Sequence, residues 1–325
     1  MKSADSTMNK GPGAAEKRRQ ILYKVRRFFL GNAEKSGFVS KLATYVILTG
    51  LGFVFVYPIL YMLSTSFMDS KDLVDSTVTW VPHQLSLENF IKAGKTLEFW
   101  DGLKDSLIMT VLPSVFQTAV LALSGYALGR FPVPFKKVWI ALAVFIFLIP
   151  EQVTMIPRYL LFNSYGLVGT IWPTYLIAVL GQGIKSSVFL LVYWQFFSSY
   201  PKSLDEAAQI DGAGRIRVFL RIALPMAVPA IVVCFLFSFI WTWNNTTQVA
   251  QYSMGAATTL PMHLEQFVDK FNKLYSSAQL STGGALNEAI RLAGTLLTIL
   301  PLVVLYLILQ KQFVESIERT GITGE

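Results

Sequence analysis

The sequence predicts an all-α membrane protein with six transmembrane helices, and two observations support that prediction. The 325 residues are 53% hydrophobic and only 15% charged, whereas soluble domains average roughly a quarter charged residues. The apolar residues also fall in six long blocks, and about 20 apolar residues suffice to cross a hydrocarbon core of about 30 Å. A compact soluble enzyme, a disordered protein and a disulfide scaffold are therefore excluded.

Each expected span contains or adjoins a proline. Neighbouring helices in a membrane bundle can bond the carbonyls that a proline frees. A kinked helix can bend around a cavity, or the kink can be tolerated without a role, and both interpretations stay open. The spans cover about residues 42–67, 107–128, 138–156, 171–197, 226–243 and 290–309, with Pro58, Pro113, Pro150, Pro173, Pro229 and Pro301 in that order.

Lysine and arginine set the expected orientation, because cytoplasmic loops carry an excess of both. With the N-terminus inside, nineteen of the 28 Lys and Arg residues lie on the cytoplasmic side and eight lie on the outer side, with Lys185 within a span. An N-in, C-in topology follows. The net charge of +8 is thereby explained by membrane orientation, and we expect no nucleic-acid partner.

The chain divides into three expected parts: a cytoplasmic tail (1–40), the six-helix transmembrane domain (41–312) and a second cytoplasmic tail (313–325). The basic stretch 17–27 is either an amphipathic helix on anionic lipid or an ordinary topology anchor. Two long outer loops, 68–105 and 244–288, hold enough aromatic residues to fold against the bundle. Long ordered loops usually carry a task, and docking of an extracellular partner is the natural one.

The cytoplasmic loop 200–225 predicts two short helices joined by a glycine turn. Ser203 and Glu206 have the spacing of a capping box that starts the first helix. Gly212 and Gly214 end it, and Asp211 is placed to cap the second. Such a hairpin, lying flat against the membrane, can be gripped by a soluble partner.

This loop resembles the "EAA" loop of permease subunits of binding-protein-dependent ABC importers. The matching residues are Glu206-Ala207-Ala208, Gly212, Ile222 and Leu224-Pro225, and they keep the family's spacing without a gap. The sequence from about residue 40 onward resembles the maltose/multiple-sugar branch. The segments that carry this likeness include Asp211-Gly212-Ala213, Gly125-Tyr126-Ala127-Leu128-Gly129-Arg130 and Thr259-Leu260-Pro261. The C-terminal tail departs from the family's usual glycine-rich ending.

The resemblance implies a subunit of a transporter in the inner cell membrane, surrounded by lipid. Its partners would be a second, homologous permease, two cytoplasmic ATPase subunits, an extracytoplasmic sugar-binding protein and a sugar substrate. ATP and Mg would be used by the ATPase, so this chain would bind no cofactor of its own. Glu206 would meet a basic residue of the ATPase, Ala207 and Ala208 would fit a narrow cleft, and Gly212 would permit the turn. Alternatively, Glu206 completes the capping box.

The sequence contains no nucleotide-binding G-x-x-x-x-G-K-[ST] motif, no nucleophile–base pair and no cluster of metal ligands. Its one cysteine, Cys234, lies in an apolar run and is expected to be a small buried hydrophobe. No catalytic residue is therefore predicted.

Ionisable groups inside spans are usually functional, which makes Lys185 the leading candidate for contact with a solute. It could instead pair with the partner permease or with Glu151. Gln182 lies in the same polar patch, and Gln152 follows Glu151. Trp241, Trp243 and Asn244 are further candidates, since sugars stack on aromatic rings, although the tryptophans also fit an aromatic belt at the outer interface.

A self-sufficient, ion-coupled secondary transporter is the alternative from another class. Such proteins often show inverted repeats and carboxylates within the membrane. The sequence shows no internal repeat and almost no carboxylate in the middle of a span. An EAA loop also has no use in that mechanism.

Overall fold

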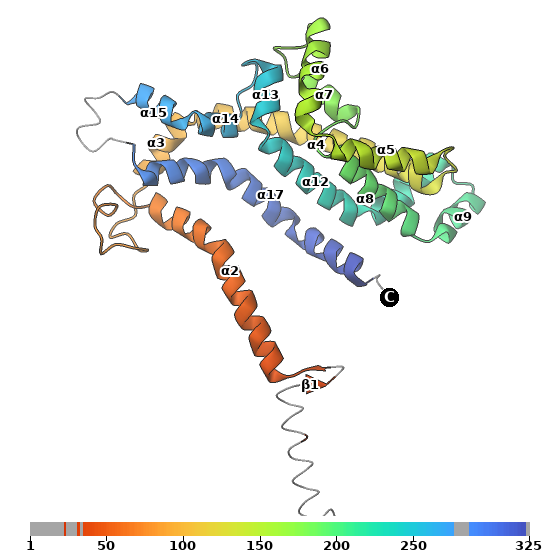
Figure 1. Cartoon of the computed structure of the whole chain (residues 1–325), viewed down its shortest axis with the longest axis horizontal. Coiled ribbons are helices and arrows are strands. Elements are labelled where there is room, and N and C mark those ends of the chain that lie inside the picture. The colour runs from red at the N-terminus through yellow and green to blue at the C-terminus, as the bar shows by residue number, and fades with distance from the viewer. Residues whose placement is uncertain (1–22, 24–30, 33–34, 276–285, 323–325) are drawn as a thin grey trace, which may run out of the picture. The chain divides into compact units, whose positions relative to one another are not determined.

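The computed structural model describes residues 23, 31–32, 35–275 and 286–322. Contacts divide the chain into two units, Met1–Ser64 and Thr65–Glu325, and Figure 1 shows the helices of both. Apart from two strands of two residues each, the described elements are helices. The prediction of an all-α protein is confirmed.

The first unit consists mainly of one long helix, α2 (Phe38–Ser66). Strands β1 (Gly31–Asn32) and β2 (Lys35–Ser36) pair antiparallel just before it. Helix α2 agrees with the expected first span, and its apolar side chains are exposed along most of its length. The basic stretch 17–27 lies outside the described residues, apart from Tyr23.

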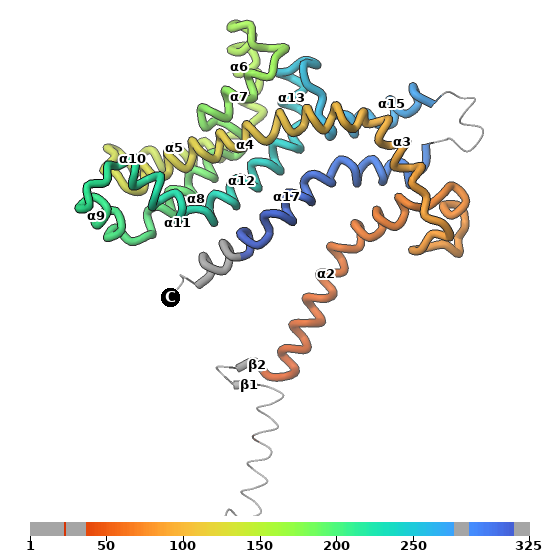
Figure 2. The backbone as a smooth tube through the Cα atoms, turned by 180° about the vertical axis from the view of Figure 1, so that it is seen from behind, coloured from red at the N-terminus to blue at the C-terminus, as the bar shows by residue number. Residues whose placement is uncertain are grey.

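The second unit is built around the long helix α4 (Phe99–Arg130), which packs against α7 (Trp172–Val179), α8 (Ser186–Ser199) and α12 (Val228–Trp243). Helix α17 (Glu288–Ile322) packs on α12 and on α3 (Glu88–Thr96). Figures 1 and 2 both place the loop that follows α8 at one end of α4, and α3 at the other. Helix α4 therefore runs from the α3 end of the unit to the end that carries the loop after α8.

Two glycines bring α4 into direct backbone contact with α8. A Cβ atom at Gly125 would lie 2.4 Å from Cβ of Tyr193, and one at Gly129 would lie 2.9 Å from Cβ of Phe197. This Gly-x-x-x-Gly spacing is typical of close helix packing in membranes. The backbones of the two helices therefore approach each other closely at these two glycines.

Some of the expected spans are interrupted. The third is divided into α5 (Lys136–Leu148) and α6 (Glu151–Ser164), with a bend of 96° between them. Pro150 is the N-cap of α6, and since proline has no backbone N–H it cannot continue a helix from the preceding turn. The fourth is divided into α7 and α8 by residues 180–185, where Gly181 has a φ of +67°.

The expected fifth span begins two residues later than predicted, at Val228. A bent stretch, Arg215–Met226, precedes it at an angle of 76°. Within the described residues, three helices are long and apolar enough to cross a membrane, and up to five spans result if each bent pair counts as one. Six uninterrupted spans are therefore not observed, because the glycine and proline breaks shorten the helices.

The expected outer loops fold onto the bundle as short helices: α3, α13 (Thr246–Ser253), α14 (Leu260–Glu265) and α15 (Phe267–Leu274). Phe267 and Phe271 join Leu97, Trp243 and Ile290 in one buried apolar cluster. The short helices of these loops therefore pack against the bundle, whereas most of residues 73–88 are exposed. At the other end of the chain, α17 continues to Ile322, beyond the expected end of the sixth span.

Candidate functional site

The loop between α8 and α12 forms two helical segments joined by a tight turn. Helix α9 (Lys202–Ile210) ends in a Schellman motif, in which the N–H of Gly212 bonds to Gln209 O at 3.0 Å and that of Ala213 bonds to Ala208 O at 2.9 Å. Gly212 has a φ of +79°, which glycine adopts without a steric penalty. The chain then continues through α10 (Arg215–Val218), the π-helical turn η1 (Phe219–Ala223) and α11 (Leu224–Met226).

The predicted capping box is wrong. Helix α9 starts at Lys202 with Pro201 as its N-cap, and no side chain caps it. Proline fixes φ and has no N–H to donate, so it sets the start of the helix one residue before Ser203. Asp211 is the C-cap of α9, and Gly214 is the N-cap of α10. Glu206 is therefore not held in a capping role.

The residues that resemble the EAA motif lie largely on the surface. Glu206, Ala207, Asp211, Gly212 and Pro225 are exposed, while Ala208, Ala213 and Leu224 are partly buried. Beside the turn lies an open hollow lined by glycine, by apolar side chains and by three arginines, namely Gly212, Gly214, Arg215, Ile216, Arg217, Leu220 and Arg221. An exposed helix next to an apolar and basic hollow is a surface that a soluble protein can contact.

Arg130, the last residue of α4, holds this loop in place. Its Nε donates to Oδ2 of Asp205 at 2.8 Å, and its two terminal nitrogens donate to the carbonyls of Tyr200 and Pro201, each at 3.1 Å. The guanidinium carbon also lies 3.6 Å from the centre of the Tyr200 ring, and the Tyr200 hydroxyl donates to Asp205. Asp205 has no role among the sequence-based expectations. A lone carboxylate one residue before Glu206 was the only available signal.

Burial and the hydrogen bond with the Asp205 carboxylate raise the pKa of the Tyr200 hydroxyl. The hydroxyl therefore stays protonated at physiological pH and remains a donor to Asp205. The start of α9 is thus fixed by an ion pair, two bonds to backbone carbonyls and a cation–π contact.

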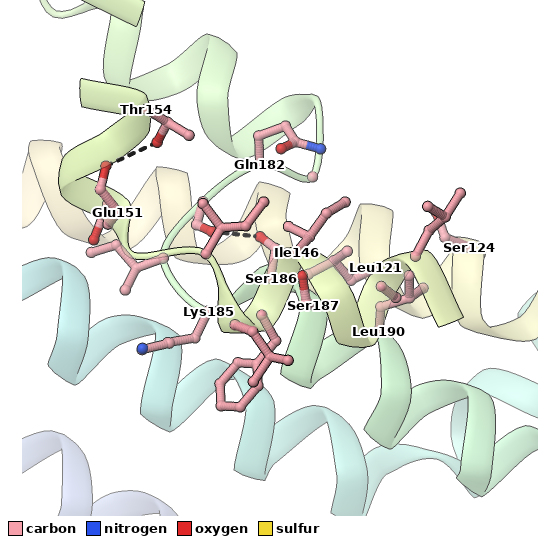
Figure 3. A pocket seen from close by; sticks show the side chains of 18 of the residues that line it. Leu121, Ser124, Ile146, Glu151, Thr154, Gln182, Lys185, Ser186, Ser187 and Leu190 are labelled. Carbon is pink, nitrogen blue, oxygen red and sulfur yellow. Dashed lines mark hydrogen bonds between the residues drawn. The ribbon is translucent and has the colours of Figure 1, made fainter. Parts of the chain in front are cut away.

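A second site is a cavity of about 1050 Å³ formed by α4, α5, the start of α6, the 180–185 break and α8. Gln152, Gln182 and Lys185 all line it, so three of the candidates for solute contact are brought together. Figure 3 shows Glu151 and Thr154 on α6, Gln182 in the break and Lys185 at its end. The cavity combines apolar walls with a few polar groups, which is the usual composition of a ligand site.

Lys185 is the N-cap of α8 and has a φ of +54°, a left-handed conformation that is unusual for a residue with a side chain. Its Nζ lies 5.4 Å from the centre of the Phe147 ring. The alternative of an ion pair with Glu151 is not observed among the described residues. Glu151 instead accepts a hydrogen bond from Gln248.

The other three candidates lie away from this cavity. Trp241 is partly buried and stacks on Phe189, with ring centres 5.5 Å apart. Trp243 is 2% exposed and belongs to the apolar cluster around Phe267. Asn244 is the C-cap of α12, and its side chain donates to Ile240 O at 2.8 Å. The structure therefore gives these three residues no shared site with Lys185.

Comparison with known proteins finds one family and a set of related chains. Residues 106–319 match the family described as binding-protein-dependent transport system inner membrane component. The diacetylchitobiose uptake system permease protein DasC of Streptomyces coelicolor is 25% identical, with 83% of this chain and 92% of the relative covered. The maltodextrin transport system permease protein MdxG of Bacillus subtilis is 26% identical, with 90% and 100% covered.

A solved structure shares the fold. It is a chain of a bacterial ABC transporter involved in the import of the acidic polysaccharide alginate. The two chains superpose with a TM-score of 0.69 at 21% sequence identity, over 85% of this chain and 96% of that one. The two chains therefore share a fold.

Proposed function

The chain belongs to the family of binding-protein-dependent transport system inner membrane components, and we propose that it is a permease subunit of an ATP-driven importer of sugars or oligosaccharides. It is a multi-pass protein of the inner membrane. The family supports a transport role and does not favour the alternative of an ion-coupled transporter. The substrate class rests on relatives that include permeases for diacetylchitobiose and maltodextrin.

The observation that carries the proposal is the exposed helix α9, anchored through Arg130 to the end of α4. In this proposal α9 enters a cleft of a cytoplasmic ATPase, with Ala207 and Ala208 fitting against the cleft and Glu206 meeting a basic group. Movement of the ATPase passes through the Arg130–Asp205 pair into α4. ATP and Mg are used by the ATPase, and this chain contributes half of the solute path.

The remaining partners and the topology complete the proposal. A second permease supplies the other half of the path, and two ATPases bind on the cytoplasmic side. A sugar-binding protein docks on the short helices that follow α12. The chain keeps six membrane passages, N-in and C-in, with α7 and α8 together as the fourth passage and the tails 1–40 and 313–325 in the cytoplasm.

The solute path is assigned to the cavity of Gln152, Gln182 and Lys185. Its polar groups can bond to sugar hydroxyls, and Lys185 can interact with an acidic or hydroxyl-rich solute. Trp241, Trp243 and Asn244 are assigned at most an indirect role, since they lie elsewhere.

Uptake by the complete complex tests the function. The chain is purified from native membranes with its partners and reconstituted into vesicles together with labelled maltodextrin, diacetylchitobiose or arabino-oligosaccharides. Uptake of at least one sugar that requires hydrolysable ATP and fails in Glu206→Ala or Gly212→Pro supports the proposal. Lys202→Ala, on the same exposed helix, is the matched control. Uptake that needs no ATP, or that both variants leave unchanged, overturns it.

A further inference from the structure

Gln117 is a buried amide in the middle of α4, with 2% of its surface exposed. Its Nε2 donates to the carbonyl of Ile184 and to the hydroxyl of Ser186, each at 2.9 Å. Its Oε1 accepts a hydrogen bond from the hydroxyl of Ser238 at 2.8 Å. One side chain thus joins α4, the break between α7 and α8, and α12. Its two N–H donors bind the end of the break at Ile184 and the first residue of α8, Ser186.

The break needs this partner. A chain that leaves the helical conformation frees backbone carbonyls, and inside a membrane they must bond to other groups. Gln117 supplies a donor to the carbonyl of Ile184. The Ser186 hydroxyl, which accepts the second bond, donates in turn to the carbonyl of Gly183 at 2.8 Å. The Gly183 carbonyl also accepts the backbone N–H of Ser186 at 3.1 Å. Gln117 therefore satisfies the Ile184 carbonyl directly and binds the hydroxyl of the residue that satisfies Gly183.

The packing at Gly183 confirms how closely the break lies on this amide. A Cβ atom added at Gly183 would lie 2.6 Å from Oε1 of Gln117, which is too close for unbonded atoms. The amide and the backbone at Gly183 are therefore in direct contact, and neither can shift toward the other.

Lys185 stands between Ile184 and Ser186, the two residues that Gln117 binds. Its left-handed backbone, with a φ of +54°, is the kind of conformation that persists only where the surroundings fix it. The side chain that projects from this backbone lines the cavity of about 1050 Å³. The bonds on both sides of Lys185 thus hold the backbone from which its side chain projects.

We propose that Gln117 is a positioning residue of the solute path, which fixes the 180–185 break and so holds Lys185 at the wall of the cavity. This inference rests on the proposed function, because it assigns the cavity to the solute. Gln117 itself contacts no solute in this arrangement. The hydroxyl of Ser238, on α12, bonds to Oε1 of the same amide. The bonds to Ile184 and Ser186 are made by Nε2 instead, so Ser238 allows the two sides of the amide to be tested separately.

Cysteine labelling in the complete, purified complex tests the inference. The native Cys234 is fully buried, so a Lys185→Cys chain presents one new thiol to a water-soluble maleimide. Gln117→Leu, which keeps the volume but removes both donors, is expected to change the labelling rate at position 185 by about fivefold or more. Ser238→Ala, which removes only the bond to Oε1, is expected to change it by less than about twofold. Thermal unfolding of each complex is measured alongside.

Equal changes in labelling for Gln117→Leu and Ser238→Ala would overturn the inference, because Gln117 would then be a general packing residue. Unchanged labelling in both would overturn it as well. If Gln117→Leu fails to assemble, Ser186→Ala, which removes one of the two bonds to the break, is compared with Ser238→Ala by the same criteria. Labelling requires no transport, so a wild-type complex that takes up no sugar defeats the proposed function and leaves this test intact.

Discussion

The guanidinium of Arg130, at the end of α4, donates Nε–H to the carboxylate of Asp205 on α9 at 2.8 Å, across 75 residues of sequence. The two side chains are only 3% and 13% exposed. The pair joins α4, around which the second unit is built, to the loop that carries Glu206. The ion pair and the carbonyl bonds around it thus attach the loop to the end of α4.

Arg130→Ala is expected to uncouple α9 from α4. Removing one partner of a buried ion pair leaves the other charge unpaired and typically destabilises by about 3 kcal/mol or more. We expect a lower unfolding temperature of the complex and a loss of ATP-driven uptake. Lys137→Ala, which removes an exposed cation at the start of α5 outside this loop, is the control. Equal effects of the two substitutions would argue against the anchoring role.

Gly125→Ala is expected to separate α4 from α8. The added Cβ would meet Cβ of Tyr193 at 2.4 Å, and overpacking of this kind costs about 1–3 kcal/mol. At Gly94, on α3, the nearest atom would lie at 3.9 Å, so Gly94→Ala should be tolerated. Thermal unfolding of the purified complex compares them, and a Gly125→Ala protein as stable as the control would contradict the close contact.

Gly212→Ala is expected to strain the turn that follows α9 in the loop between α8 and α12. An L-residue in the left-handed region costs about 1–2 kcal/mol, and Gly212 has a φ of +79°. Gly214 has an ordinary φ of −67° and open space around it, so Gly214→Ala provides a control two residues away. Sugar-stimulated ATP hydrolysis should fall in the first variant and not in the second. An equal loss of ATP hydrolysis in both variants would contradict the prediction, because the effect would then come from altering this exposed surface and not from straining the turn at Gly212.

The turn-rich segment before α3 is expected to loosen as the pH rises. Nδ1 of His83 lies 2.8 Å from Oδ1 of Asp72, and this hydrogen bond raises the pKa of His83 above its ordinary value of 6.5. A raised folded pKa means that the stabilisation is complete below the unfolded pKa and is lost as the pH passes the folded one. Protease cleavage within residues 69–87 should therefore accelerate as the pH rises above about 6.5.

His83→Gln provides the control for this effect. Glutamine keeps a polar side chain but does not titrate, so the cleavage rate in residues 69–87 should no longer depend on the charge of position 83. A pH dependence that is the same in the variant would assign it to another group.

Hydropathy predicted the positions of the long helices, because α2, α4 and α17 lie where apolar blocks do. It could not predict which prolines interrupt a helix. Pro58, Pro113 and Pro301 lie inside continuous helices, whereas Pro150 stands at a bend of 96°. The difference is decided by tertiary packing, since neighbouring helices determine whether a freed carbonyl finds a partner.

The candidate sites were predicted unevenly for the same reason. The glycine turn at Gly212 follows from local chemistry, and the structure contains it. The capping box failed because Pro201 sets the start of the helix. The partners of Arg130 and Gln117 lie about 70 residues away along the chain, and one sequence gives no measure of such distances. Trp243 was predicted to contact a sugar, whereas it is buried in the core. Its burial depends on packing against helices that follow it in the chain, and the sequence around Trp243 does not indicate that packing.

The bend between α5 and α6 has a consequence for the surrounding lipid. Helix α5 has 13 residues and, at about 1.5 Å per residue, rises about 20 Å, against about 30 Å of hydrocarbon. As a membrane passage of its own, α5 is shorter than the hydrocarbon layer, and local thinning of the bilayer relieves this mismatch. The break that holds Lys185 lines the same cavity as this helix, so we expect the bilayer to be thinned around the cavity. A thinner hydrocarbon layer there would shorten the apolar distance that a hydrophilic solute has to cross.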